Sequence, residues 1–165
     1  MSTPPRLLPD EPLPPYAYVP GRAPHPFSDP RGHSYQRPLP QPSLPDPCRW
    51  TECREYLYGL DLFNHGYYWE AHEAWEGLWH ACGRRGRLAD FFKGLIQLAV
   101  AGVKLREGRP EGVRSHAARA AALFEQVPEN VFMGLSLADL QAAAKRCEAA
   151  ISGTDLPVLL PIQEP

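Results

Sequence analysis

The strongest helical signal of the chain lies in residues 88–107, LADFFKGLIQLAVAGVKLRE. Apolar side chains recur there with the period of a helix, and those on one face are Phe92, Leu95, Ile96, Ala99 and Val103. Polar side chains occupy another face, namely Asp90, Lys93, Gln97 and Lys104. A helix with one apolar stripe must bury it against other elements. The sequence therefore predicts an amphipathic helix from about Leu88 to Glu107.

Helical signals continue on both sides of this segment. Upstream, we expect one helix from about Thr51 to Asn64, with Thr51 as its N-cap, and a second from about Tyr67 to Ala81. Downstream, the expected helices are Pro110 to Gln126 and Ser136 to Ile151, the last with Ser136 as its cap. No apolar–polar alternation is long enough to build a sheet. The predicted fold is all-α, an antiparallel bundle of about five helices within residues 48–152.

Prolines dominate the part of the chain before this bundle. Fifteen of the 20 prolines lie in residues 1–47, which show no helical or alternating apolar period. Runs such as Pro12-Leu13-Pro14-Pro15 favour extended polyproline conformations that bury little surface. We therefore expect a disordered proline-rich tail over residues 1–47, either a spacer or a ligand for a protein partner with an aromatic-lined groove. Residues 153–165 are expected to form a loose C-terminal tail.

Composition and charge argue against several classes of protein. The first ten residues lack the apolar stretch of a secretory signal, and no window approaches the ~20 apolar residues that cross a bilayer. The four cysteines contain no C-x-x-C pair, which argues against a structural zinc site and favours reduced thiols. A net charge of −2 disfavours nucleic acid as a partner, although residues 84–119 are locally basic. We expect a cytoplasmic protein without membrane contact, and a homo-oligomer is compatible with the sequence.

An unusual density of aromatic and ionisable side chains marks residues 67–80, YYWEAHEAWEGLWH. On a helix, His72, Glu73 and Glu76 fall on one side. Ionisable groups beside large apolar side chains must be paired, metal-bound or shifted in pKa, because an isolated buried charge is costly. These three are the candidate catalytic residues. The pattern predicts a polar pocket between the second and third expected helices, whose further members are Asn64, Trp75, Trp79, Lys93 and Gln97.

Three interpretations of this pocket remain open. His72, Glu76 and His80 follow one another at four-residue spacing, which suits a divalent metal ion and a hydrolase-like centre. The pattern departs from H-E-x-x-H of zinc hydrolases, because Glu76 replaces the second histidine. Without a metal, Glu73 or Glu76 would act as acid or base with His72, and Lys93 would hold an anion. Alternatively, the cluster is hydrogen-bonded inside the bundle, and the protein is a non-catalytic interaction module.

Two blocks of sequence resemble a known family. They are residues 62–79, LFNHGYYWEAHEAWEGLW, with the pattern H-E-x-W-E-x-x-W, and residues 92–99, FKGLIQLA, with G-L-I-Q. Over about residues 55–127 the chain is similar to the small bacterial and archaeal family called domain of unknown function number 309. The resemblance implies an all-helical fold and supplies no established activity; members often carry glutamine in place of Lys93. The motif positions it implies are Asn64, Gly66, His72, Glu73, Trp75, Glu76, Trp79, Gly94 and Gln97.

Overall fold

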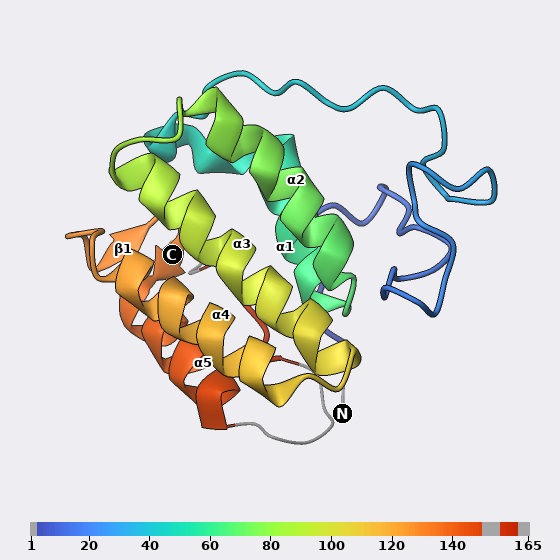
Figure 1. The fold of residues 1–165 in the computed structure, drawn as a ribbon. Helices are drawn as coiled ribbons and strands as arrows, with labels where there is room; N and C mark the ends of the chain where they lie inside the picture. The colour runs from blue at the N-terminus through green and yellow to red at the C-terminus, as the bar shows by residue number, and fades with distance from the viewer. Residues whose placement is uncertain (1–2, 150–155, 162–165) are drawn as a thin grey trace.

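A computed structural model describes residues 3–149 and 156–161, and over these residues the fold is all-α (Figure 1). The helices are α1 (Arg54–Asn64), α2 (Tyr68–Ala81), α3 (Arg87–Arg106), α4 (Pro110–Phe124) and α5 (Leu137–Ala149), preceded by the short 3-10 helix η1 (Pro47–Glu52). Each α-helix packs against the next, and successive helices run in opposite directions, so the expected antiparallel bundle is confirmed. Among the described residues, no helix is long and apolar enough to span a membrane.

The start of the bundle differs from the sequence expectation, whereas the start of α5 agrees with it. Thr51 lies inside η1 rather than at an N-cap, and α1 begins only after Cys53. At α5, the Ser136 hydroxyl accepts the backbone N–H of Asp139 at 3.2 Å, so the expected cap is confirmed. The expected end of this helix at Ile151 lies outside the described residues.

A small hairpin precedes α5, which the sequence did not predict. Strand β1 (Val131–Phe132) pairs antiparallel with β2 (Leu135–Ser136). The turn between them has positive φ at Met133 (48°) and Gly134 (78°), as in a type I′ turn. Tyr56 of α1 donates its hydroxyl hydrogen to the Met133 carbonyl at 2.8 Å. Strands of two residues are too short to show alternation, which is why the pattern missed them.

The core lies along α3, which packs between α2 and α4. Two glycines of α3 allow close approach: a Cβ at Gly94 would overlap the Phe124 ring, and one at Gly102 would overlap the Tyr68 ring. Because a side chain at either position would overlap an aromatic ring, glycine is needed there, although glycine inside a helix otherwise costs stability. The largest fully buried side chains are Trp75, Tyr56, Phe91, Phe92, Phe124, Leu60, Leu62, Leu78, Leu95, Leu98, Leu140 and Val113.

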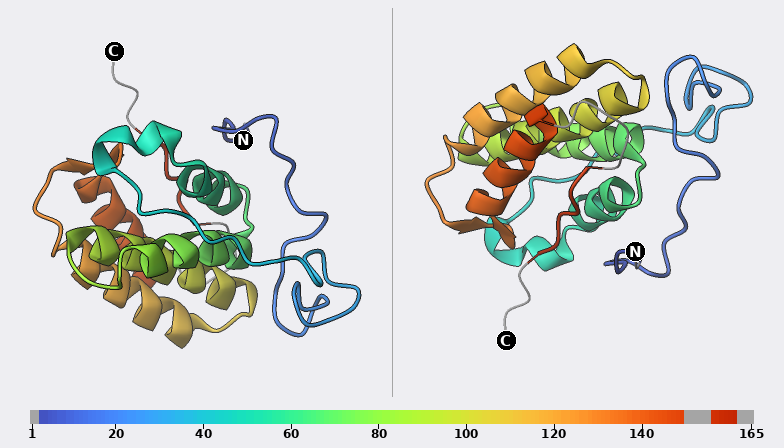
Figure 2. Two further views of the ribbon diagram at one scale, coloured as in Figure 1. Left: turned by 90° about the horizontal axis from the view of Figure 1, so that it is seen from above. Right: turned by 90° about the horizontal axis from the view of Figure 1, so that it is seen from below.

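The N-terminal segment, residues 3–46, contains no regular helix or strand but lies on the α1 and α2 side of the bundle (Figure 2). Asp61 of α1 accepts the backbone N–H groups of Leu7 and Leu8 at 2.7 and 2.8 Å. The disorder expected for residues 1–47 is therefore not confirmed. The absence of apolar periodicity did not reveal that the segment is bound to the bundle, because the binding uses hydrogen bonds between its backbone and distant carboxylates.

Residues 156–161 also lie against the bundle. The Asn64 side chain donates to the Leu159 carbonyl and accepts the Leu159 N–H, both at 2.7 Å. The backbone N–H of Leu156 donates to the Tyr68 hydroxyl at 2.8 Å. A loose C-terminal tail is therefore not confirmed for these residues, and the other residues of the expected tail lie outside the described ranges.

Candidate functional site

Helix α2 brings three of the predicted site residues together. Ala71, Trp75 and Leu78 are completely buried and fix the helix against the core. His72, Glu73 and Glu76, here called the α2 cluster, each offer one ligand atom, and these atoms lie within 4.8 Å of one another. Helix geometry brings Glu76 to both other members, because His72 and Glu73 lie four and three residues before it, about one turn away on the same face. Glu73 is the direct sequence neighbour of His72.

His72 is the centre of the α2 cluster. Its Nδ1 atom lies 3.5 Å from Oε1 of Glu73, and its Nε2 atom lies 3.4 Å from Oε2 of Glu76. Nδ1 is also 3.3 Å from the carbonyl oxygen of Trp69. The side chains of His72, Glu73 and Glu76 are 20, 28 and 35% exposed, so the cluster is partly covered and still open to solvent on one side.

The environment changes the acidity of two cluster members. Burial lowers the pKa of His72, and the positive charge of Lys93 lowers it further. The Glu76 carboxylate and the hydrogen bond to the Trp69 carbonyl act against this shift. Burial, with Glu76 and Glu70, raises the pKa of Glu73 from 4.5 to about 7. Near neutral pH the imidazole is therefore neutral and able to bind a metal or a proton, while Glu73 is divided between its acid and carboxylate forms.

The donor set of the α2 cluster suits a divalent transition metal ion. One neutral imidazole nitrogen and two carboxylate oxygens are ligands that zinc, manganese and iron accept. Donor atoms bound to one tetrahedral zinc ion stand about 3.3–3.6 Å apart, close to the 3.4 and 3.5 Å found between His72 and the two carboxylates. Because the two carboxylates face different ring nitrogens, one side chain must rotate for all three to bind a single ion.

Lys93 of α3 and Trp79 of α2 border the cluster. The Lys93 ammonium lies 4.1 Å from the centre of the Trp79 ring, and the Arg84 guanidinium lies 5.3 Å from it. Such contacts are favourable cation–π interactions. The Lys93 charge acts on His72 and lowers its pKa, which places it within electrostatic reach of the cluster. An anion drawn to Lys93 would lie near the α2 cluster.

The comparisons with known proteins agree with the resemblance seen in the sequence. Residues 56–116 match the model of the domain of unknown function DUF309. A comparison with curated proteins found no match. The DUF309 match includes α2 and α3 entirely, together with most of α1 and the first part of α4. It therefore contains the α2 cluster, whereas the N-terminal segment and α5 lie outside the matched residues.

Other predicted site residues within the DUF309 match are used elsewhere in the fold. Trp75 is buried in the core and donates its indole N–H to the Tyr56 carbonyl at 3.4 Å. The side-chain oxygen of Gln97 pairs with Nδ1 of His116 on α4 at 2.7 Å. Asn64 holds the C-terminal residues, as described above. The structure does not bring these side chains to the α2 cluster.

His80, expected as a metal ligand, is also separate from the α2 cluster. It is exposed near the end of α2, and its Nδ1 atom lies 3.1 and 2.8 Å from two nitrogens of Arg84. The third member of the cluster is Glu73 instead. Four-residue spacing predicted a ligand at His80, but adjacent Glu73 reaches the imidazole from within the same turn.

Sequence reasoning missed a second ionisable group on α2. Glu70 is only 7% exposed, and its Oε1 atom accepts the backbone N–H of Tyr18 at 2.8 Å and meets Nε2 of His33 at 2.9 Å. A buried carboxylate requires such partners. The sequence does place Glu70 on the opposite side of the helix from His72, which indicates a separate environment for this carboxylate. Its partners could not be predicted, because they lie in the proline-rich segment, which has no periodic pattern.

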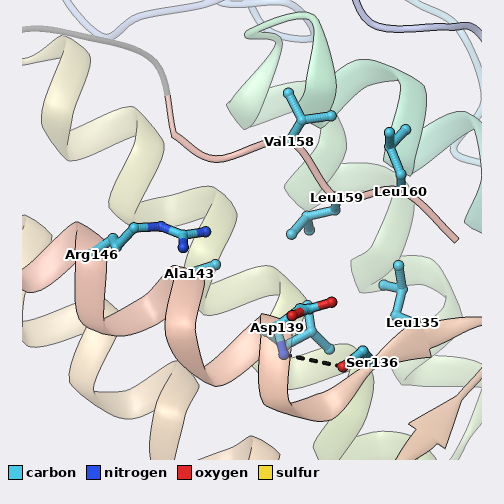
Figure 3. Close-up of a pocket in the computed structure, with 9 residues that line it drawn as sticks. Leu135, Ser136, Asp139, Ala143, Arg146, Val158, Leu159 and Leu160 are labelled. Carbon is cyan, nitrogen blue, oxygen red and sulfur yellow. Dashed lines mark hydrogen bonds between the residues drawn. The ribbon is translucent and has the colours of Figure 1, made fainter. Parts of the chain in front are cut away.

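A cavity of about 220 Å³ lies away from the α2 cluster, between α5, β2 and the C-terminal residues (Figure 3). Six of its nine lining residues are apolar, Arg146 and Asp139 are its charged members, and the capping bond from the Asp139 backbone to Ser136 lies at its edge. No residue predicted as a site member lines this cavity. This cavity is therefore not the pocket expected between the second and third helices.

Proposed function

We propose that the α2 cluster binds a divalent transition metal ion and that the protein is a small metal-dependent hydrolase. The observation that carries this proposal is the convergence of His72, Glu73 and Glu76, whose ligand atoms lie within 4.8 Å of one another on a face that remains partly open. Three protein ligands leave a coordination position for water, which is typical of catalytic rather than structural zinc sites. A metal ion held by these residues would act by lowering the pKa of water at that position toward neutrality.

The charge balance of the cluster supports a cation. Burial and the repulsion that Glu76 and Glu70 exert on Glu73 raise its pKa to about 7. A metal ion would replace the proton that Glu73 otherwise needs. The imidazole favours zinc, manganese or iron over calcium and magnesium, which prefer oxygen ligands alone. Lys93 would then attract the anionic part of a substrate to the metal.

Metal binding is tested on protein purified without a histidine tag. Elemental analysis and calorimetric titration with zinc and with manganese should give one ion per chain, and His72→Ala and Glu76→Gln should each lower the affinity by tenfold or more. His80→Ala is the matched control, because His80 lies on the same helix but outside the cluster, and it should bind as the wild type does. Binding lost in His80→Ala and kept in His72→Ala would refute the proposed ligand set.

A second candidate function is a non-catalytic helical interaction module. It is favoured by Asp61 and Glu70, whose carboxylates hold an extended segment on the outer face of α1 and α2. In this case the α2 cluster would fix local structure only. The two candidates differ in one simple result: if no metal binds and His72→Ala only lowers the melting temperature, the interaction module is the better description.

A further inference from the structure

Two carboxylates of the bundle are directed at the N-terminal segment. Asp61 on α1 is completely buried and accepts the N–H groups of Leu7 and Leu8, one at each oxygen, at 2.7 and 2.8 Å. The Arg6 guanidinium lies 3.0 Å from the same carboxylate. This arrangement recognises an arginine followed by two free backbone N–H groups, with charge-assisted hydrogen bonds at both oxygens.

Glu70 on α2 is the second carboxylate that holds the segment, and Asp61 and Glu70 are here called the two anchors. It accepts the Tyr18 N–H at 2.8 Å and meets the His33 imidazole at 2.9 Å, and the side chains of His33 and Glu70 are 5 and 6% exposed. The other carboxylate oxygen of Glu70 is buried and has no hydrogen-bond partner among the described residues. Both anchors therefore bind the backbone of the segment together with one basic side chain.

An aromatic contact lies beside the second anchor. The rings of Tyr18, His25 and Phe27 surround Trp69 of α2, with centroid distances of 5.1, 5.4 and 5.7 Å. Between the two anchors, the chain is interrupted by prolines that favour an extended backbone. A segment whose prolines leave it few accessible conformations loses less entropy on binding.

The core of the bundle does not depend on the segment. Within the described residues, the buried hydrophobic core begins at Tyr56, and the segment adds to it only partly buried hydrophobic side chains such as Leu7, Leu8 and Leu13. Buried groups of the segment itself include Pro26 and the His33 side chain, which are not members of that core. Carboxylates are poor choices for a permanently buried surface, because desolvating them is costly. They suit a face that water can reach when the segment leaves.

We propose that the face of α1 and α2 around Asp61, Trp69 and Glu70 is a peptide-binding surface, and that residues 6–33 are its resident and releasable occupant. The ligand class is a proline-interrupted peptide without regular helix or strand, which forms turns within residues 20–36. It offers an arginine and two free backbone N–H groups to Asp61, a third N–H group and an imidazole to Glu70, and aromatic rings to Trp69.

Release of the segment would also uncover one flank of the α2 cluster. Trp69, which contacts the rings of Tyr18, His25 and Phe27, lies 6.2 Å from His72 by ring centroids. Residues 6–33 therefore cover α2 next to the α2 cluster, at Trp69. This consequence rests on the proposed metal site, whereas peptide binding itself does not and is measured without metal.

The test uses the full chain with a recognition sequence for a site-specific protease inserted after Leu39, which is 62% exposed. After folding and cleavage, the N-terminal fragment should co-elute with the bundle in size-exclusion chromatography. A fluorescent synthetic peptide of residues 3–36 should exchange with it, as measured by anisotropy. Asp61→Asn and Glu70→Gln should each weaken retention on the order of tenfold to a hundredfold, because each loses charge-assisted hydrogen bonds.

Glu125→Gln, directly after the end of α4, is the matched control, because Glu125 is exposed and far along the chain from both anchors. It should retain the fragment as the wild type does. Two results would overturn the proposal. One is a fragment that separates from a folded bundle at once, or equally fast in all variants. The other is exchange that occurs only with loss of the far-ultraviolet helical signal, which would make the segment part of the fold rather than a ligand.

Discussion

His72 lies between two carboxylates, and its closest approach is the 3.4 Å between its Nε2 atom and Oε2 of Glu76, one turn further along α2. The imidazole cannot form ideal hydrogen bonds to both neighbours at these distances. Such a loose arrangement has room for a proton or a metal ion to draw the groups together. Predictions about this cluster can therefore be tested through protonation as well as through metal binding.

Glu73 should make stability depend on pH. Its pKa is raised from 4.5 to about 7 by burial and by Glu76 and Glu70, so between these pH values the folded chain holds a proton that the unfolded chain has lost. The contribution of Glu73 to the free energy of unfolding therefore falls as pH rises through this window. Relative to the wild type, Glu73→Gln should gain about 1–2 kcal/mol between pH 5 and 8, measured by urea unfolding.

Two features make this measurement specific. The lowered pKa of His72 acts in the opposite direction, since it costs stability on acidification, but His72 is present in both chains and largely cancels in the difference. Glu125→Gln, a change at an exposed acid, should show no such gain. A difference between Glu73→Gln and wild type that stays constant from pH 5 to 8 would contradict the raised pKa.

Lys93 should influence the titration of His72. Since the Lys93 charge lowers the pKa of His72, Lys93→Gln should raise it toward its ordinary value. The imidazole proton shifts in an NMR titration report this change directly. Arg84→Gln is the control, because Arg84 contacts His80 and Trp79 instead. Equal His72 titration in the wild type and Lys93→Gln would show that Lys93 is too distant to act on the cluster.

Gly94 should be required for the packing of α3 against α4. A Cβ at this position would overlap the Phe124 ring, which is itself fully buried, so Gly94→Ala should lower the free energy of unfolding by about 1–3 kcal/mol. Gly112→Ala provides a comparison in a helix, because its Cβ would meet only the flexible chain of Lys104. That variant should be close to neutral. Similar losses in both would mean that overlap with Phe124 is not the cause.

Asn64 should hold the C-terminal residues to α1. Asn64→Ala removes both hydrogen bonds to Leu159, and we expect faster hydrogen exchange at the Leu159 amide with a loss of about 1–3 kcal/mol. Gln97→Ala, which removes a bond between α3 and α4, should leave that amide protected. Unchanged exchange in Asn64→Ala would show that other contacts position these residues.

The helices were predictable because each carries its own pattern. The apolar stripe of α3 gave its extent almost correctly, and Ser136 marked the start of α5 through a local bond to Asp139. Thr51 failed as a cap because Asp46 and Pro47 start η1 earlier, and the side chain of Asp46 accepts the N–H of Cys48. Local signals compete at a helix start, and the sequence does not rank them.

The site was predictable only in part, because some of its members are set by tertiary contacts. Helical spacing brought His72 and Glu73 to Glu76, as expected for side chains about one turn apart on one face. The same reasoning could not show that the side chain of Gln97 pairs with His116, or that Glu70 pairs with His33, 37 residues earlier. A proline-rich segment without periodicity gives no information on which carboxylate its backbone will meet.

X-ray absorption spectroscopy of the untagged, zinc-loaded protein measures the ligands of the metal directly. We expect nitrogen and oxygen scatterers at about 2.0–2.2 Å, with the multiple scattering of one imidazole, and no sulfur shell near 2.3 Å. In His72→Ala the imidazole signal should disappear. Zinc held by sulfur, or a spectrum that is the same in the wild type and His72→Ala, would contradict a metal site at His72, Glu73 and Glu76.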